Sequence, residues 1–361
     1  MYILVTLVIL LILFATFVLN LPVFGAKPKG ERLQKIMNLP LYKDGALQNQ
    51  SLTPALPPDL SYFTILKRVI KGNKNGSPTQ TLPHLIPSLE NSDQLKITWF
   101  GHSSYFIQVD GFNILVDPVF SERPSPFQFM GTKRFKGTDF IKTADFPSLD
   151  LILITHDHYD HLDYHAILAL KDKTKYFITS LGVGAHLERW GVKSDQIVEL
   201  VWDEEYVAFA DLKFTALPSR HFSGRGFKRN QTLWSSFALQ TKNYNLYLGG
   251  DSGYDTHFNT IGEKYGPFDL AILECGQYNT MWPLIHLFPE YVAQAGTDLQ
   301  AKRIMPVHWA KYKLALHDWN EPIERLMKAA SEKKIEVITP MLGQSFTWGD
   351  HLPTESWWRN L

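Results

Sequence analysis

The residues whose types and spacing point most directly to chemistry lie between Leu151 and Asp163, in the sequence LILITHDHYDHLD. The apolar run 151–154 predicts a short buried strand. Four potential metal ligands follow it within six residues, namely His156, His158, Asp160 and His161. A loop that leaves a strand can direct the first two to one centre while the last two turn toward a second. Imidazole and carboxylate together suit Zn²⁺, although iron and manganese accept the same ligands. We therefore predict metal binding here rather than a polar surface turn.

Three further candidate ligands each come shortly after an apolar run that is typical of a strand. They are His221, Asp251 and His308. A loop that follows a buried strand is where rigid scaffolds present functional groups. A single His or Asp at a strand end more often has a structural role, but together the three supply the ligands that two metal ions still need. We predict His156, His158 and His221 at one centre, Asp160, His161 and His308 at the other, and Asp251 bridging both.

Such an arrangement has a definite chemistry. Two metal ions about 3.5–4 Å apart lower the pKa of a bridging water toward neutrality and neutralise the charge that develops on a substrate oxygen. The resulting hydroxide is a nucleophile, so neither serine nor cysteine is required. Asp160 can hold or shuttle the proton of that water if its second oxygen reaches it. The sequence therefore predicts a hydrolase with two Zn²⁺ ions per chain and Asp160 as a catalytic residue.

The composition of the whole chain narrows the class of protein. Its 361 residues carry 36 basic and 36 acidic side chains, so no excess of positive charge indicates a nucleic-acid partner. Cys275 is the only cysteine, which excludes an intrachain disulfide and a thiolate-rich metal site. A chain of this length can bury one large catalytic core.

Hydrophobic patterning predicts which elements position these residues. Strands are expected at 96–100, 105–109, 113–116, 151–154, 176–179, 196–201, 206–210, 213–217, 235–240, 244–248, 270–274 and 303–307, and helices at 62–70, 164–169, 182–190, 255–264, 289–297 and 322–333. Asp110-Gly111 is a strong hairpin signal, and the segment 117–146 predicts a long functional loop. Strands followed by alternating strands and helices, twice over, predict two sheets packed face to face with helices outside.

The N-terminus is unlike the rest of the chain. Residues 2–19 form an uncharged apolar stretch that is long enough to span a bilayer, and Lys27, Lys29, Arg32 and Lys35 follow it. We predict a membrane helix or signal anchor at 1–20 with the catalytic domain on the cytoplasmic face, and the alternative is export after signal cleavage. An irregular arm is expected at 21–94, wrapping a hydrolase domain at 95–350.

The motif THDHYDH, followed by His221, Asp251 and His308 in this order, resembles the metallo-β-lactamase superfamily. This resemblance implies an α/β fold, the αβ/βα four-layer sandwich, with a dinuclear zinc site between the sheets. Five blocks are similar to the N-acylphosphatidylethanolamine-hydrolysing phospholipase D group. They are WFGHSS from Trp99, DPVFSERPSPFQFMGTKRF from Asp117, THDHYDHLDY from Thr155, GDSGY from Gly250 and KYGPFDLAIL from Lys264.

The resemblance implies cleavage of the phosphodiester bond of a phospholipid, with release of phosphatidic acid. His286 matches a histidine that lies near the substrate phosphate in that family, so we expect a catalytic role for it. We also expect contacts with substrate from His102, from Lys133 and Arg134 in a basic cluster, and from Trp282 at the entry for acyl chains. The expected partners are a phospholipid or other phosphodiester and a membrane, and a second copy of the chain is a candidate partner.

Other functions remain open from the sequence. A lactonase or an RNA-processing nuclease of the same superfamily carries the same ligands, but balanced charge and the apolar N-terminus disfavour the nuclease. A membrane-tethered binding protein without activity is disfavoured because all seven predicted ligands are present. A flavin-linked di-iron oxidoreductase is disfavoured because its pattern has Glu where His158 stands.

Overall fold

Two seven-stranded sheets form the centre of the molecule. The structure is a computed structural model that describes residues 2–54, 57, 60–209 and 211–361. The order in the first sheet is β16 (Ser345–Thr347), β3 (Lys96–Trp99), β4 (Tyr105–Val109), β5 (Phe112–Val116), β6 (Leu149–Ile154), β7 (Thr174–Ser180) and β8 (Ile197–Leu200). Strands β16 to β5 pair antiparallel, and β5 to β8 pair parallel. The predicted hairpin is confirmed, since Val109 pairs with Phe112 across Asp110-Gly111.

The second sheet repeats this mixed pattern. Its order is β15 (Glu336–Val337), β14 (Arg303–Val307), β13 (Leu270–Glu274), β12 (Asn245–Leu248), β11 (Ser236–Gln240), β10 (Leu212–Leu217) and β9 (Glu205–Ala208). Strands β9 to β12 pair antiparallel and β12 to β15 parallel. Ala210, the last residue of the predicted strand 206–210, lies outside the described residues.

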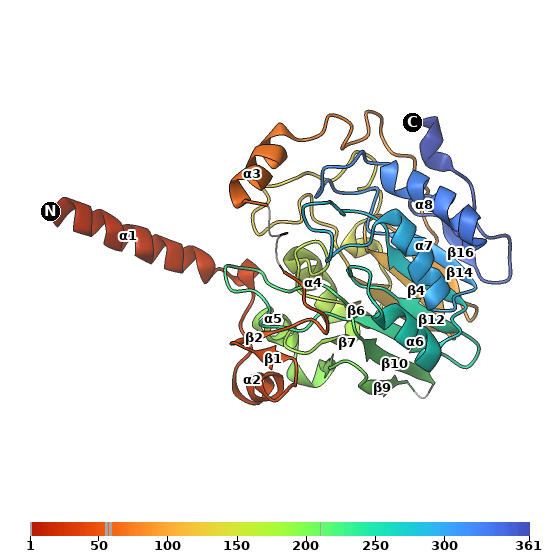
Figure 1. The fold of residues 1–361 in the computed structure, drawn as a ribbon. Helices are drawn as coiled ribbons and strands as arrows, with labels where there is room; N and C mark the ends of the chain where they lie inside the picture. Colours follow the sequence, from red (N-terminus) through yellow and green to blue (C-terminus); the bar gives the residue numbers. More distant parts are fainter. Residues whose placement is uncertain (1, 55–56, 58–59, 210) are drawn as a thin grey trace.

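Helices cover the outer faces of both sheets (Figure 1). They are α4 (Tyr164–Leu170) and α5 (Gly184–Arg189) on the first sheet, and α6 (His257–Tyr265), α7 (Pro289–Asp298) and α8 (Glu321–Lys333) on the second. Short 3₁₀ helices lie at Pro22–Phe24, Thr143–Asp145, Lys171–Lys173, Ser194–Gln196 and Trp357–Asn360. The predicted four-layer architecture is confirmed.

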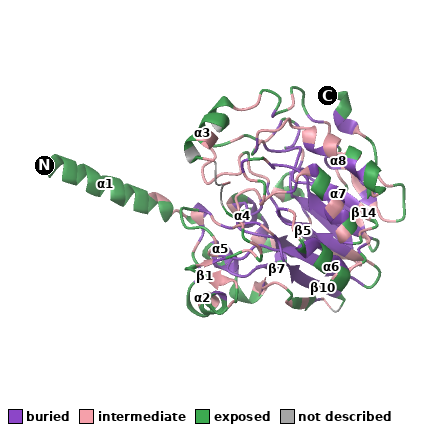
Figure 2. Ribbon diagram, in the orientation of Figure 1, coloured by how far each residue is buried: buried purple, intermediate pink, exposed green. Residues whose placement is uncertain are grey.

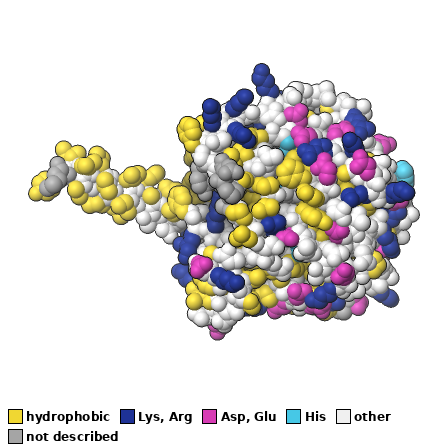
Figure 3. All heavy atoms as spheres, viewed as in Figure 1, with side chains coloured by type: hydrophobic (Ala, Val, Ile, Leu, Met, Phe, Trp, Pro, Cys, Tyr) yellow, Lys and Arg dark blue, Asp and Glu magenta, His cyan; other side chains and the backbone are white. Residues whose placement is uncertain are grey.

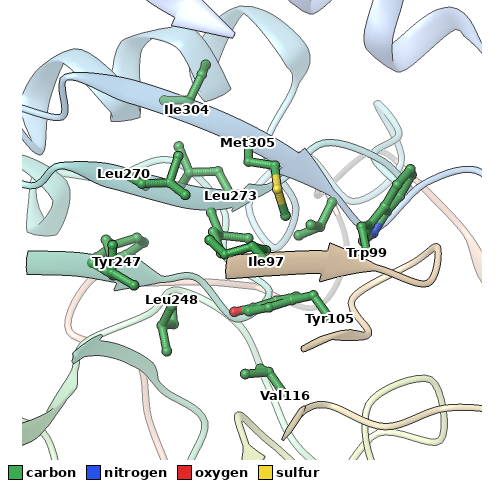
Figure 4. Close-up of a cluster of buried hydrophobic side chains, with 14 of the residues drawn as sticks. Ile97, Trp99, Tyr105, Val116, Tyr247, Leu248, Leu270, Leu273, Ile304 and Met305 are labelled. Carbon is green, nitrogen blue, oxygen red and sulfur yellow. The ribbon is translucent and has the colours of Figure 1, made fainter. Parts of the chain in front are cut away.

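Side chains that alternate between the two faces of a strand fill two separate cores, one between the sheets and one beneath the helices of the first sheet. In β6, Leu151 and Leu153 pack between the sheets, whereas Ile152 and Ile154 pack beneath α4 and α5, because successive side chains of a strand point to opposite faces. Both faces are covered, so β6 is wholly buried and, apart from Asp150, apolar. Figure 4 shows the core between the sheets, where Ile97 and Tyr105 of the first sheet meet Leu248 and Met305 of the second.

The N-terminal region has more structure than the irregular arm predicted for 21–94. It contains α2 (Gly30–Met37), a hairpin of β1 (Tyr42–Lys43) and β2 (Ala46–Leu47), and α3 (Tyr62–Lys71). Only α3 is foreseen by the sequence pattern, because the others are too short to show a clear period. Ile36 and Leu47 pack with Leu181 and Trp234 in a small separate core, which attaches the arm to the loops after β7 and before β11.

Helix α1 (Tyr2–Leu19) projects from the domain and contributes no buried residue (Figures 1 and 2). It is 18 residues long and apolar enough to cross a membrane. The predicted long loop 117–146 is likewise present, with a single 3₁₀ turn at Thr143–Asp145 as its regular structure.

Candidate metal centre

All seven predicted ligands lie at the carboxyl ends of strands, on one edge of the two sheets. The HDHYDH segment follows β6, His221 follows β10, Asp251 follows β12 and His308 follows β14. Asp163 then begins α4 by accepting hydrogen bonds from the backbone N–H groups of His165 and Ala166, so the ligand loop is fixed between a buried strand and a capped helix. His308 has a φ of 67°, a left-handed conformation of the kind that concentrates at functional sites.

The first group of ligands comprises His156, His158, His221 and Asp251, whose ligand atoms all lie within 4.8 Å of one another. His158 Nδ1 is 2.9 Å from His156 Nε2 and 3.1 Å from His221 Nε2. The structure therefore brings together the three histidines that the sequence assigns to one centre.

The second group comprises His102, Asp160, His161 and His308. The Nε2 atoms of His161 and His308 are 3.3 Å apart, and Asp160 Oδ2 is 3.4 Å from His308 Nε2. His102 is the addition to the predicted set. It is fully buried, and its Nε2 atom lies 3.0 Å from Asp160 Oδ2, where it can donate a hydrogen bond.

Asp251 lies between the two groups and offers one oxygen to each. Its Oδ1 atom is 3.2 Å from His161 Nε2 and 3.3 Å from His308 Nε2. Its Oδ2 atom is 3.7 Å from His221 Nε2 and 3.9 Å from His156 Nε2. This is the arrangement that a bridging carboxylate requires.

Two further observations indicate that these ligand atoms are suited to metal ions. Asp251 Oδ1 is buried yet accepts no hydrogen bond with proper geometry from the described residues, although an unpaired buried carboxylate oxygen is costly. Ring nitrogens of different histidines also converge to about 3 Å, where each pair needs a proton or a cation between its lone pairs. Two cations at these positions satisfy both needs.

The electrostatics of the second group also favour cations. Burial alone would lower the pKa of His308, but Asp251 and the hydrogen bonds of Asp160 and Glu274 raise it to about 10. For His161 burial likewise opposes the charged form, but Asp251 and Asp117 raise its pKa above the ordinary value. The buried carboxylates thus hold positive charge at this position, which a metal ion supplies more effectively than protons do.

Hydrogen bonds to the other ring nitrogens orient the ligands, as outer-shell partners usually do. His161 Nδ1 lies 2.7 Å from Asp117 Oδ2, and His221 Nδ1 lies 2.8 Å from the carbonyl oxygen of Ile285. Each contact leaves Nε2 facing the centre. Asn49 of the N-terminal arm also holds the backbone of His221 in place. Its side chain donates a hydrogen bond to the carbonyl oxygen of His221 and accepts one from its N–H.

His286 stands beside the centre and is held by Glu274. Its Nδ1 atom is 2.7 Å from Glu274 Oε2 and 3.9 Å from Asp251 Oδ2. Glu274 is 1% exposed and also accepts a hydrogen bond from the backbone of Ser252. Glu274, Asp117 and Asn49 are site residues that were not predicted from the sequence. Glu274 could have been found as a carboxylate that ends an apolar strand.

A cavity of about 740 Å³ opens onto both groups, and we call it the catalytic cavity. His158, Asp160, His221, Asp251, His286 and His308 form its floor. Its walls combine apolar side chains, including Ile65 of α3 and Ile285, with Arg229. This volume lies within the range of about 300–1,000 Å³ that is typical of small-molecule sites.

The residues predicted to contact substrate fall in different places. Trp282 lines the catalytic cavity. His102 is buried behind Asp160, and Lys133 pairs with Glu122 on the surface at 2.8 Å. Arg134 donates to the carbonyl oxygen of Phe120. These last three do not line the cavity, and the cations found there are Arg225 and Arg229.

The fold and this ligand set agree with comparisons to known proteins. Residues 112–309, more than half of the chain, match the Beta-lactamase superfamily domain. The chain belongs to the metallo-β-lactamase superfamily, and it is a metallo-hydrolase of that superfamily.

Individual relatives indicate which group within the superfamily this chain resembles. An uncharacterized protein of Mycobacterium tuberculosis is 40% identical over 334 residues, 89% of this chain and 87% of its own. The N-acyl-phosphatidylethanolamine-hydrolyzing phospholipase D 1 of Caenorhabditis elegans is 31% identical over 271 residues, 70% of this chain and 76% of its own. The predicted resemblance to that phospholipase D group is therefore confirmed.

Solved structures share the fold across different chemistries. A metallo hydrolase from Ignicoccus hospitalis superposes with a TM-score of 0.54 at 22% identity, over 72% of this chain and 100% of its own. The diiron β-hydroxylase CmlA from Streptomyces venezuelae gives 0.55 at 17% identity, over 72% of this chain and 54% of its own. The fold thus occurs both in a hydrolase and in a hydroxylase, so the reaction must be inferred from the site.

Proposed function

We propose that this chain is a dinuclear zinc phosphodiesterase of the phospholipase D type, acting on N-acylphosphatidylethanolamine-like phospholipids. The observation that carries the proposal is Asp251, whose two oxygens face two groups of ligands at the floor of a partly apolar cavity. The relatives named for phospholipase D activity support the substrate class.

Two zinc ions bound here would supply a hydroxide near neutral pH and neutralise charge on the phosphate. In the hydrolysis, an oxygen from water adds to phosphorus, the phosphorus–oxygen bond to the head-group alcohol breaks, and phosphatidic acid is the lipid product. Asp160 is positioned to accept the proton of the attacking water, with His102 fixing its Oδ2 atom. His286 faces the cavity while Glu274 holds its Nδ1 atom, so in its protonated form it can donate a proton to the leaving oxygen from Nε2.

Apolar walls and a cation suit a phospholipid. Trp282 and Ile285 can contact acyl chains, and Arg229, which lies over the Phe222 ring at 4.8 Å, brings positive charge to the same cavity. Met281 and Leu287, in the same segment of the chain, are only 1% exposed and have a packing role.

We also propose that α1 anchors the domain in a membrane, with the domain on the cytoplasmic face. Its length and uncharged apolar sequence support a spanning helix. Lys27 and Lys29 follow it on the surface, and positive residues at the end of such a helix favour the cytoplasmic side. A second copy of the chain remains a predicted partner, and the mass of the detergent-solubilised protein tests it.

The decisive experiment is a head-group release assay on purified full-length protein, with several phospholipids and the soluble phosphodiester bis(p-nitrophenyl) phosphate. We expect release from N-acylphosphatidylethanolamine in preference to phosphatidylcholine. Elemental analysis of the same preparation should find about two zinc ions per chain. Turnover of lactones without phosphodiester cleavage would overturn the assignment, and one metal or none in untreated folded protein would overturn the dinuclear centre.

A further inference from the structure

A second cavity, of about 480 Å³, lies where α1 joins the domain. Thr16, Leu19 and Asn20 at the end of α1 line one side of it, and the segment 224–228 lines another. We call it the juxtamembrane cavity. Residues 224–227 also line the catalytic cavity, so the two cavities share a wall but open onto different residues. No metal ligand named above lines the juxtamembrane cavity.

The position of this cavity relative to α1 is fixed by hydrogen bonds. Arg225 donates to the carbonyl oxygen of Val23 at 2.9 Å, and Trp190 Nε1 donates to that of Pro22 at 2.7 Å. The N–H of Ala26 donates to His186 Nδ1 at 3.0 Å. At Gly25 any Cβ would lie 1.9 Å from the His186 ring, so only glycine permits this approach. We call residues 20–26 the latch.

The latch places the cavity next to the bilayer that α1 would enter. Val23 is four positions after Leu19, and a chain advances at most about 14 Å over four positions. The polar head-group layer is about 5–8 Å deep on each side of the hydrocarbon core. The wall of the cavity formed by the latch therefore lies within or just outside the head-group layer.

The lining of the cavity is strongly cationic. Among the described residues it includes Lys27, Lys29, Arg189, Arg225 and Lys228, against the single carboxylate of Asp157. That carboxylate is already engaged, because it accepts hydrogen bonds from the N–H of Gly224, from Thr232 and from His186.

Most of this positive charge has no partner within the protein. Arg32 and Lys35 pair with Glu188, Glu199 and Glu204 on the neighbouring surface. In the described part of the chain, no carboxylate lies within ion-pair distance of Lys27, Lys29 or Lys228, and all three side chains are exposed. Figure 3 shows Lys and Arg side chains gathered on the domain where α1 leaves it.

We propose that the juxtamembrane cavity binds the phosphate head group of an anionic phospholipid of the bilayer, with Lys27, Lys29 and Lys228 as its principal contacts. Basic pockets beside membrane helices hold anionic head groups in this way. The inference rests on the proposed membrane anchor but not on the proposed reaction. A lipid bound here is held beside the catalytic cavity, across the shared wall 224–227, and it is not the molecule that is cleaved.

The test uses full-length protein reconstituted in nanodiscs of phosphatidylcholine with a minor fraction of phosphatidylglycerol. Native mass spectrometry after detergent extraction counts the lipids that stay bound. We expect about one phosphatidylglycerol retained per chain, and we expect the triple variant Lys27→Gln, Lys29→Gln, Lys228→Gln to reduce its retention by about tenfold or more. A matched variant of exposed lysines that line neither cavity, Lys142→Gln, Lys242→Gln, Lys328→Gln, should retain it.

Two further measurements separate the alternatives. Inorganic phosphate should not displace the lipid, and displacement at comparable concentration would identify a site for a soluble anion instead. Hydrolysis of bis(p-nitrophenyl) phosphate should be the same in the triple variant and the wild type, since these lysines lie outside the catalytic machinery. Equal retention of phosphatidylcholine, or equal loss in the matched variant, would overturn the proposal. Protein that is soluble without detergent would instead overturn the anchor.

Discussion

At the scale of single residues, Asp251 is the side chain on which both groups of ligands depend. Its Oδ1 and Oδ2 atoms face different histidines, so Asp251→Ala should weaken the binding of both metal ions by more than about tenfold. His221→Ala removes a ligand from the first group alone and should weaken mainly one ion. Competition with a chromophoric chelator measures both affinities. The bridging role is wrong if the two variants lose the same single ion.

Lys311 is a second residue with a testable consequence, for stability rather than catalysis. It is fully buried, and its Nζ atom donates to the carbonyl oxygens of Val119 at 2.7 Å and Phe100 at 3.1 Å. Burial, with a smaller effect from Arg134, lowers its pKa to about 7. The unfolded chain, with a lysine pKa near 10.5, therefore binds a proton between these values that the folded chain has released.

Because the unfolded state then holds more protons, the free energy of unfolding should rise as pH rises from about 7 to 9, with a limiting slope of about 1.4 kcal/mol per pH unit. Below pH 7 both states are protonated and this contribution becomes constant. Lys311→Met should flatten the rise, whereas Lys242→Met at an exposed position should not. Urea unfolding across this range measures it, and an unchanged slope in Lys311→Met would assign the effect to other groups.

The metal ligands were easier to predict from the sequence than the residues that hold the site histidines in place, and the reason is physical. His156 to His161 lie in one short segment after a strand, so their spacing alone indicates a centre. Asp117 and Glu274 act through contacts with residues far away in the chain, at His161 and His286. Patterns of neighbouring residues do not show which distant residues will come into contact. The same limit applies to Lys133 and Arg134, whose charge suggested substrate contact but whose partners are on the surface.

At the scale of elements, the segment 277–289 joins the metal centre to the wall of the catalytic cavity. Ile285 accepts a hydrogen bond from His221, His286 faces the floor, and Trp282 lines the wall with its Nε1 atom donating to the carbonyl oxygen of Gln277 at 2.8 Å. Long strands and helices were predicted well because their periodicity extends over many residues, whereas a segment without regular structure such as this gives no pattern to read.

Trp282→Glu should weaken turnover of N-acylphosphatidylethanolamine by about tenfold or more, since a charge at the wall opposes entry of acyl chains. Turnover of bis(p-nitrophenyl) phosphate, which needs no apolar wall, should stay near the wild-type rate. Tyr291→Glu changes a half-exposed aromatic residue on α7 that lines neither cavity, and serves as the control. Equal loss on both substrates would mean that Trp282 has only a structural role.

At the scale of the whole molecule, the N-terminal region is part of the folded domain although it lies outside the residues that match the superfamily domain. Asn49 clamps His221, Ile65 lines the catalytic cavity, and the latch pairs with Arg225 and His186. Apart from the helix at 62–70, the sequence indicates only an irregular arm there, because polar and proline-rich segments acquire their place from the surface on which they lie. The anchor and the centre are thus connected through an arm that packs on the domain rather than through a free linker.

The stability of a truncated protein should therefore depend on whether the deletion stops before or after the latch. Deleting residues 2–19 removes a helix that buries nothing, so the protein should become soluble while its free energy of unfolding and metal content stay unchanged. Deleting 2–26 also removes the carbonyl of Val23 from the buried Arg225 and the N–H of Ala26 from His186. Leaving buried polar groups unpaired costs about 1–3 kcal/mol each, so this longer deletion should lower the free energy of unfolding by at least that amount. Urea unfolding of both truncated proteins makes the comparison, and equal stability would show that the latch contributes nothing to the fold.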